Sequence, residues 1–201
     1  MPQTRHSYFP FPADETGKIP SRDECFGYWE QYAMLPQIQD HSLTVASISL
    51  QLAEMACSHG LSINRRLVDA AALLHDLAKT YTIEHGGSHS QIGGAWVVRL
   101  TGNLAIAQAV IHHVHWPGDI SIQHALLPLI IIYADKRVKH DRIVSIEDRF
   151  HDLFERYGIN EQRRRSIHAS LQQTRLIESR LSLELEVSLD AYPFDRRGLV
   201  Q

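Results

Sequence analysis

An unbroken run of five apolar residues, 70–74, leads directly into His75 and Asp76. Burying a carboxylate beside such a run costs free energy unless the carboxylate is paired or binds a metal ion. A histidine and an aspartate at one helix end can share a metal ion. The run therefore predicts a buried helix that ends in a metal-binding pair, and it requires further ligands elsewhere in the chain. Candidates stand at five positions: His41, His89, His112, His113 and Asp135.

A second acidic residue, Asp135, follows a largely apolar stretch over 126–134, and the same cost of burial applies to it. With His41 and the first pair, it places four nitrogen and oxygen ligands on three predicted helices. Such helices can converge on one ion and leave a coordination position for water or substrate. Each residue alone has a simpler interpretation. An isolated histidine is usually packed or capping, and Asp135 can pair with Lys136 or Arg137.

The composition predicts one globular domain. The chain has 201 residues, of which 44% are apolar and 21% charged, enough for one sizeable core. Its 20 basic and 23 acidic residues are mixed along the sequence and leave a formal net charge of −3, which does not favour duplex nucleic acid. Cys25 and Cys57 are expected to be buried in helices, which suits a cytoplasmic protein. No signal peptide or membrane span is expected.

Apolar periodicity predicts an all-α fold. Ser21 and Glu24 fit a capping box, Ser88 is an expected N-cap, and Gly93–Gly94 permit a close approach of a neighbouring backbone. Only 183–189 alternates as a strand would, and it overlaps the last helix. The predicted helices span about 21–35, 36–57, 64–78, 88–100, 103–113, 121 or 128 to 135, 145–157 and 160–187.

These elements predict three parts of one domain. Residues 1–20, rich in proline and aromatic residues, are expected to form an extended arm. Residues 21–145 are expected to form the metal-binding helical domain, and 146–201 to form C-terminal helices and a tail packed on it. The helix over 160–187 is long enough to pair with a second copy, so a homodimer through the C-terminal helices is one expectation.

Three motifs resemble the HD superfamily of metal-dependent phosphohydrolases. Residues 71–79 match the core motif of that family, 89–93 match a second histidine motif, and 112–113 match a third. The resemblance covers about half the chain, from His41 to Arg142, and keeps the family's order of His, then His-Asp, then a distant Asp. It implies a compact multi-helix HD bundle with a hydrolytic metal site.

In the branches with additional histidines, the resemblance implies two divalent ions bridged by an aspartate. Consecutive residues of a regular helix point about 100° apart, so both histidines of the third motif face one ion only if the helix frays. Iron or manganese is expected first, with cobalt, nickel and zinc as alternatives. The first ion would bind His41, His75, Asp76 and Asp135, and the second Asp76, His89, His112 and, as a further ligand, His113.

The expected catalytic residues are Asp76 and Lys79. Lys79 lies one turn after Asp76, matches the family motif and can neutralise a phosphate, although it can also simply complete a helix end. Lys79, His115 and Arg137 are the expected substrate-binding residues, with Arg137 on a distal phosphate and His115 at the pocket mouth. For Arg137, a solvated basic face is at least as simple an interpretation. The run Arg163–Arg165 is predicted to be a solvated helix face.

The preferred hypothesis is therefore a cytoplasmic hydrolase that cleaves a phosphoester or phosphoanhydride bond in a nucleotide or small phosphorylated metabolite through a metal-activated hydroxide. The same ligands also suit an HD-type di-iron oxygenase, which needs molecular oxygen. A third hypothesis is a non-catalytic HD module that senses a nucleotide. The sequence Trp116-Pro117-Gly118 replaces the Gly-Tyr-Pro of the cyclic dinucleotide branch, which argues against that substrate.

Overall fold

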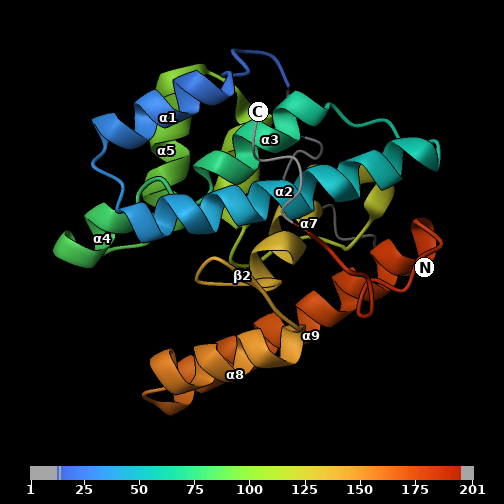
Figure 1. Cartoon of the computed structure of the whole chain (residues 1–201). Coiled ribbons are helices and arrows are strands. Elements are labelled where there is room, and N and C mark those ends of the chain that lie inside the picture. The colour runs from blue at the N-terminus through green and yellow to red at the C-terminus, as the bar shows by residue number, and fades with distance from the viewer. Residues whose placement is uncertain (1–12, 14, 196–201) are drawn as a thin grey trace, which may run out of the picture.

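The computed structural model describes residue 13 and residues 15–195, and it confirms the all-α prediction (Figure 1). The elements follow the predicted order, with two additions, a short helix over 79–85 and a two-stranded hairpin over 138–143. They are α1 (Arg22–Gln31), α2 (Pro36–Ser58), α3 (Arg65–Leu74), α4 (Lys79–His85), α5 (His89–Thr101), α6 (Leu104–His112), α7 (Ile122–Lys136), β1 (Val138–Lys139), β2 (Arg142–Ile143), α8 (Ile146–Tyr157) and α9 (Glu161–Glu184).

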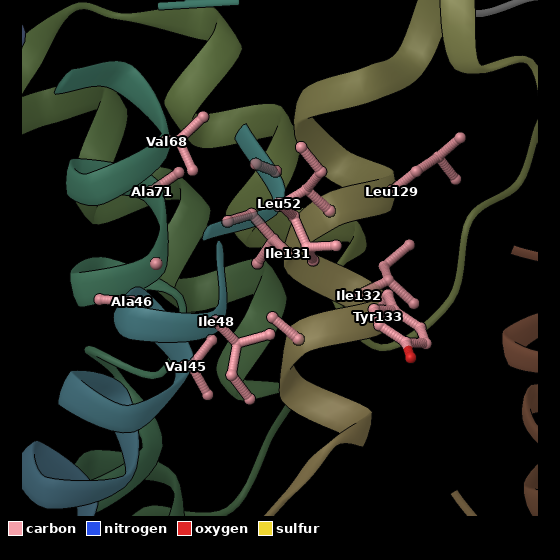
Figure 2. Close-up of a cluster of buried hydrophobic side chains, with 14 of the residues drawn as sticks. Val45, Ala46, Ile48, Leu52, Val68, Ala71, Leu129, Ile131, Ile132 and Tyr133 are labelled. Atoms are coloured by element: carbon pink, nitrogen blue, oxygen red, sulfur yellow. The ribbon is translucent and has the colours of Figure 1, made fainter. Parts of the chain in front are cut away.

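The core lies where α2, α3 and α7 pack together (Figure 2). Val45, Ile48 and Leu52 form the predicted stripe on α2 and are fully buried. They meet α3 on one side and the apolar stretch of α7 on the other. Because α2 carries His41, α3 leads to His75 and α7 carries Asp135, the same packing that excludes water brings the candidate ligands together.

The helix α3 ends at Leu74, four residues before its predicted end, so His75 and Asp76 lie in the turn that follows. The His75 ring Nδ1 is 2.7 Å from the carbonyl oxygen of Ala72, the oxygen that would otherwise accept the Asp76 N–H in a continuing helix. Backbone bonds three residues apart, such as Lys79 N–H to Asp76 O, continue the turn. The chain then forms α4, a short helix where the sequence predicted a loop.

The helices α5 and α6 pack closely, as the two glycines predicted. A Cβ added at Gly94 would overlap the side chain of Ile111 on α6. Asn103 caps α6, whereas Ser88 makes no side-chain capping bond to α5. The described end of the N-terminal arm lies against this corner, where Lys18 N–H donates to Thr101 O at 2.8 Å. The rest of the predicted arm lies outside the described residues.

The helix predicted to begin at Ser121 or Pro128 is α7. Ser121 is its N-cap, and Pro128 lies inside it, after a kink at Ala125. After it, β1 and β2 form an antiparallel hairpin that the sequence did not predict, because two-residue strands are too short to show alternation. The alternating segment 183–189 is not a strand in the structure. Cys25 is buried as expected, but the expectation for Cys57 was wrong, since its side chain is exposed.

The helices α8 and α9 form a hairpin beside the body of the molecule (Figure 1). Three residues in the second half of α9 are buried, namely Thr174, Ile177 and Leu181, and the Tyr133 hydroxyl on α7 donates to Glu178 at 2.9 Å. The first half of α9 is largely exposed. Among the described residues, none of the helices combines the length and the apolar character needed to cross a bilayer.

Candidate metal centre

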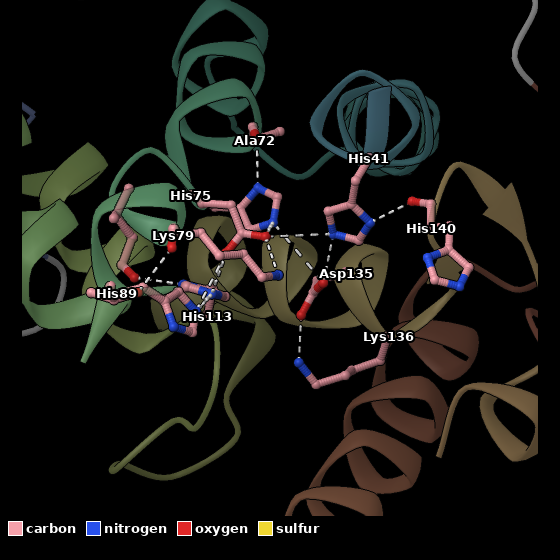
Figure 3. A network of polar contacts seen from close by, with 12 residues as sticks. His41, Ala72, His75, Lys79, His89, His113, Asp135, Lys136 and His140 are labelled. Atoms are coloured by element: carbon pink, nitrogen blue, oxygen red, sulfur yellow. Dashed lines mark hydrogen bonds and ion pairs between the residues drawn. The ribbon is translucent and has the colours of Figure 1, made fainter. Parts of the chain in front are cut away.

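Five segments deliver histidine and aspartate side chains to one buried cluster (Figure 3). His41 comes from the second turn of α2, and Asp135 is the penultimate residue of α7. The turn after α3 supplies His75 and Asp76, the first residue of α5 is His89, and a fourth histidine, His113, is the C-cap of α6. The six residues brought together are His41, His75, Asp76, His89, His113 and Asp135.

Asp76 stands at the centre of the cluster, and its two carboxylate oxygens face different groups of donors. Oδ2 is 3.4 Å from His75 Nε2 and 3.9 Å from His41 Nε2. Oδ1 is 3.4 Å from His89 Nε2 and 3.6 Å from His113 Nε2. The carboxylate therefore lies between two sets of ring nitrogens.

Asp135 completes the first set. Its Oδ1 lies 3.0 Å from His41 Nε2 and 4.0 Å from His75 Nε2. In the second set, His89 Nε2 and His113 Nε2 are 3.1 Å apart. Two ligand atoms that each lie about 2.1 Å from one ion are separated by roughly 3 Å when they are adjacent and by up to roughly 4.2 Å when they lie opposite each other, so the separations of 3.0 to 4.0 Å in the two sets are compatible with metal sites.

Backbone carbonyls orient three of the histidine rings. The ring Nδ1 atoms of His41, His75 and His113 lie 2.8, 2.7 and 2.7 Å from the carbonyl oxygens of His140, Ala72 and Val110. A ring that donates its Nδ1 proton to a carbonyl keeps the lone pair on Nε2, which is the atom that faces the carboxylates. This arrangement is typical of metal-binding histidines.

Two buried atoms in the cluster lack a hydrogen-bond partner among the described residues, and a bound metal ion would coordinate them instead. Among the described residues, His75 Nε2 and Asp76 Oδ1 make no hydrogen bond although they are shielded from solvent. Leaving such atoms unpaired is costly. Imidazole nitrogens with carboxylate oxygens are also the donors that suit divalent transition metals. The residues present therefore fit two divalent ions.

The protonation states also favour metal binding. Burial lowers the pKa of His41 and His113 below the usual value and lowers the pKa of His89 to about 4, so these rings are neutral at pH 7. Burial acts to raise the pKa of Asp76 and Asp135, but neighbouring charges, chiefly Lys79 and Lys136, outweigh it and hold the pKa of each carboxyl well below its usual range.

His75 differs from the other rings. Burial acts to lower its pKa, but the charges of Asp76 and Asp135 together with the hydrogen bonds to the ring outweigh burial, so the pKa of His75 is raised. A proton on His75 and a metal ion would compete for the same Nε2 atom.

Cationic side chains surround the two carboxylates. Lys79 Nζ lies 2.6 Å from Asp76 Oδ2, and Lys136 contacts Asp135 Oδ2. Arg149 on α8 places a guanidinium nitrogen 3.8 Å from Asp135 Oδ1. Of these, the sequence singled out Lys79 and considered Lys136, whereas Arg149 was missed because nothing in the sequence showed that α8 folds back over the cluster.

The structure does not bring His112, His115 or Arg137 to the cluster. The ring of His112 packs edge-on against Trp116 at 5.6 Å, and His115 is exposed on the following loop. Arg137 points toward the C-terminal segment, where it donates to the Tyr133 hydroxyl at 2.6 Å and to the carbonyls of Leu189 and Val144. His113, next to His112, faces Asp76 instead.

A cleft of about 400 Å³ opens between the cluster and the α8–α9 hairpin. The cluster side provides Lys79, His89, His113, Asp135 and Lys136. The other side includes Arg163, Ser166, Ile167 and Ser170, a stripe at the i, i+3, i+4, i+7 spacing of one helix face. That spacing was visible in the sequence, but the sequence did not show that this face is turned toward the site.

Comparisons with known proteins agree with this geometry. The chain matches the HD domain family over residues 38–153. It is 36% identical over 86 residues to a ribonuclease Y of Protochlamydia amoebophila, across 43% of this chain and 16% of that protein. It is 38% identical over 76 residues to a ribonuclease Y of Petrotoga mobilis, across 38% of this chain and 14% of that protein. The chain thus aligns with a small part of each relative, and no solved structure matches it.

Proposed function

We propose, from the premise that this chain belongs to the HD domain family, that it cleaves a phosphoester or phosphoanhydride bond in a nucleotide with the help of two divalent metal ions. The HD domain defines a superfamily of metal-dependent phosphohydrolases. The observation that carries the proposal is the position of Asp76, whose two carboxylate oxygens each face a separate set of potential metal ligands.

The ligand assignment follows from the two sets. His41, His75, Asp135 and Asp76 Oδ2 would hold one ion, and His89, His113 and Asp76 Oδ1 would hold the other. Bound there, the ions would supply a water of lowered pKa and Lewis-acid stabilisation of the phosphoryl oxygens. His112 has no part in this assignment, because its ring packs against Trp116.

The chain's own cations would position the phosphate. Lys79 lines the cleft beside Asp76, and its ion pair raises its pKa although burial acts to lower it, so the amine stays protonated. Lys136 and Arg149 line the same cleft next to Asp135. Oriented cations of this kind stabilise the negative charge that develops on a phosphoryl group during displacement.

The substitution Asp76→Asn tests this function, because it keeps the size of the side chain but removes the bridging charge. Protein purified without chelator is assayed for bound metal and for phosphate release from a panel of nucleotides, with and without oxygen. We expect about two equivalents of metal in the parent protein, and a loss of activity of more than about a hundredfold in the variant, since even residues that only orient ligands contribute 10- to 100-fold.

The matched control is Asp23→Asn, which alters an exposed aspartate on α1 and should leave both readouts unchanged. Circular dichroism checks that both variants keep the helical fold. Undiminished phosphate release in Asp76→Asn would contradict the proposal. Turnover that stops when oxygen is removed would instead favour the di-iron oxygenase.

A second candidate is cleavage of a phosphodiester bond in single-stranded RNA. It is favoured by the two ribonuclease Y relatives, although each alignment covers a small part of those proteins. Incubation with a 5′-labelled oligoribonucleotide distinguishes the candidates, because a ribonuclease shortens the strand whereas a nucleotide hydrolase leaves it intact.

A further inference from the structure

Part of the wall of the cleft opposite the cluster lies outside the region that matches the HD domain family. The helix α9 begins at Glu161, beyond the end of the family match at residue 153. Its residues Arg163, Ser166, Ile167 and Ser170 nevertheless line the cleft, together with Tyr157 at the end of α8. The match to the HD domain family therefore does not describe this part of the wall.

The inner end of the cleft suits an anion. Lys79, Lys136 and Arg149 are gathered there beside the two carboxylates. The side chain of Arg149 belongs to a residue only 8% exposed, and its Nε atom is buried without a hydrogen-bond partner among the described residues. A buried, incompletely paired guanidinium group at a cleft is well suited to bind a phosphate oxygen.

The outer end of the same cleft is apolar. Ile83 is 66% exposed, Val114 is 42% exposed and Tyr157 is 45% exposed, and all three line this cleft. Leu153 and Ile167 add partly buried apolar surface between them. Apolar groups gathered at the rim of a polar site indicate a ligand with an apolar part.

The Tyr157 ring is suited to stacking. The guanidinium carbon of Arg156 lies 5.3 Å from the ring centroid and contacts the ring as a cation–π pair. The ring is still 45% exposed, so aromatic surface remains for a ligand. A nucleobase has the flat, apolar surface that stacks on such a ring. The cleft of about 400 Å³ is near the lower end of ligand-binding pockets, which fits a single nucleotide unit.

We propose that the α8–α9 hairpin forms a nucleotide subsite in which Tyr157 stacks on the base while Arg149 and Lys136 bind the phosphate next to the metal cluster. The inference rests on the proposed function for the identity of the reacting group. The inference goes beyond the proposed function because it assigns recognition of the substrate to the α8–α9 hairpin. The shared chemistry is a nucleotide, either free or at the end of an RNA strand.

Binding is measured by isothermal titration calorimetry, independently of turnover. The probes are phosphonate analogues of the four nucleoside 5′-monophosphates, in which a methylene group replaces the ester oxygen, and the same analogue of ribose 5-phosphate, which lacks a base. We expect at least one nucleotide analogue to bind about tenfold more tightly than the ribose analogue, because base–aromatic stacking contributes on this scale.

The variant Tyr157→Ala should abolish most of that difference, and Tyr157→Phe should retain it because the ring is kept. Ile159→Ala is the matched control, since Ile159 is 80% exposed nearby but does not line the cleft. Equal affinities for nucleotide and ribose analogues, no binding of any probe, or equal losses in Tyr157→Ala and Ile159→Ala would overturn the proposal.

A trinucleotide distinguishes the two sources. Tighter binding than that of the mononucleotide analogue assigns the subsite to an RNA end, and equal or weaker binding assigns it to a free nucleotide. Different results would contradict the proposed hydrolase function and the proposed nucleotide subsite. Base-dependent binding without phosphate release contradicts the hydrolase alone, whereas phosphate release that ignores the base and Tyr157→Ala contradicts the subsite alone.

Discussion

The two sides of the cleft differ in how deeply their side chains are buried and in how firmly those side chains are held. On the cluster side, His41, His75 and His113 are buried, and each ring has a backbone carbonyl that holds its far nitrogen. On the hairpin side, Arg163 and Ser166 are exposed, and Ile167 is half-buried. Donors to a metal ion must hold their geometry closely, whereas a surface that recognises a ligand by area and shape tolerates movement.

This difference predicts how substitutions act. Changes on the cluster side should alter metal affinity or stability steeply, because the side chains there are buried, close-packed and linked to one another by polar contacts. Changes on the hairpin side should mainly alter affinity for the substrate.

The adjacent histidines after α6 give the sharpest test. His113→Ala should lower metal affinity more than about a hundredfold, or about 3 kcal/mol, because it removes a proposed ligand. His112→Ala should change metal affinity only a few-fold, since the His112 ring packs against Trp116. Metal titration of both variants measures the effect, and similar losses in the two would refute the assignment.

A substitution of Arg137 tests whether this residue stabilises the fold or binds the substrate. Arg137→Met should destabilise the protein by about 2.5 kcal/mol, because the buried guanidinium group donates to the carbonyls of Leu189 and Val144 and their loss leaves acceptors unpaired. KM for a nucleotide should stay unchanged. Thermal unfolding and steady-state kinetics check this, with the exposed Arg165→Met as a control that should leave stability unaltered. A raised KM with normal stability would restore Arg137 as a substrate-binding residue.

Packing between α5 and α6 tests the rigidity of the cluster side. Gly94→Ala should destabilise the protein by about 2 kcal/mol, because the new methyl group would overlap Ile111 two residues before His113. Gly27→Ala on α1 is the matched control, since an added Cβ there meets nothing within 4 Å and should favour the helix slightly. Denaturant unfolding of the two variants measures the difference. Equal stabilities would show that the α5–α6 contact yields easily.

The capping residue of α9 tests the hairpin side. Asn160→Ala removes the side chain that accepts from Arg163 N–H and should cost about 1 kcal/mol, expressed as faster amide exchange in the first turn of α9. Metal content should not change. Asn64→Ala removes the equivalent cap of α3 and should lower global stability instead, because α3 lies in the core. Loss of metal from Asn160→Ala would show that the two sides are coupled more tightly than their contacts indicate.

Local signals in the sequence predicted most of the helices. Ser21 and Glu24 form the predicted capping box, and Asn103 caps α6. The failures lie where a tertiary contact competes with a local preference. The helix α3 stops at Leu74 because the His75 ring takes the Ala72 carbonyl, and α4 was missed because its few residues carry no apolar period.

Among the candidate site residues, those on long buried helices were the most predictable. Asp135 follows an apolar stretch and His41 precedes an apolar stripe, and the 3.6-residue period identifies the inward face of each helix. The choice between His112 and His113 was not predictable, because it depends on where α6 ends. The cleft residues on α8 and α9 were also out of reach, since apolar spacing indicates which face of a helix is inward but not which partner it meets.

The helical class, the family and most of the candidate donors could be predicted from the sequence, because residue chemistry and helical periodicity are local properties of the chain. Long-range packing was needed to show that Asp76 faces two groups of histidines, that Lys136 and Arg149 line the cleft while Arg137 contacts the C-terminal segment, and that α9 closes the opposite wall. Neighbouring residues on a helix point about 100° apart, so their roles separate only when long-range packing sets what each one meets.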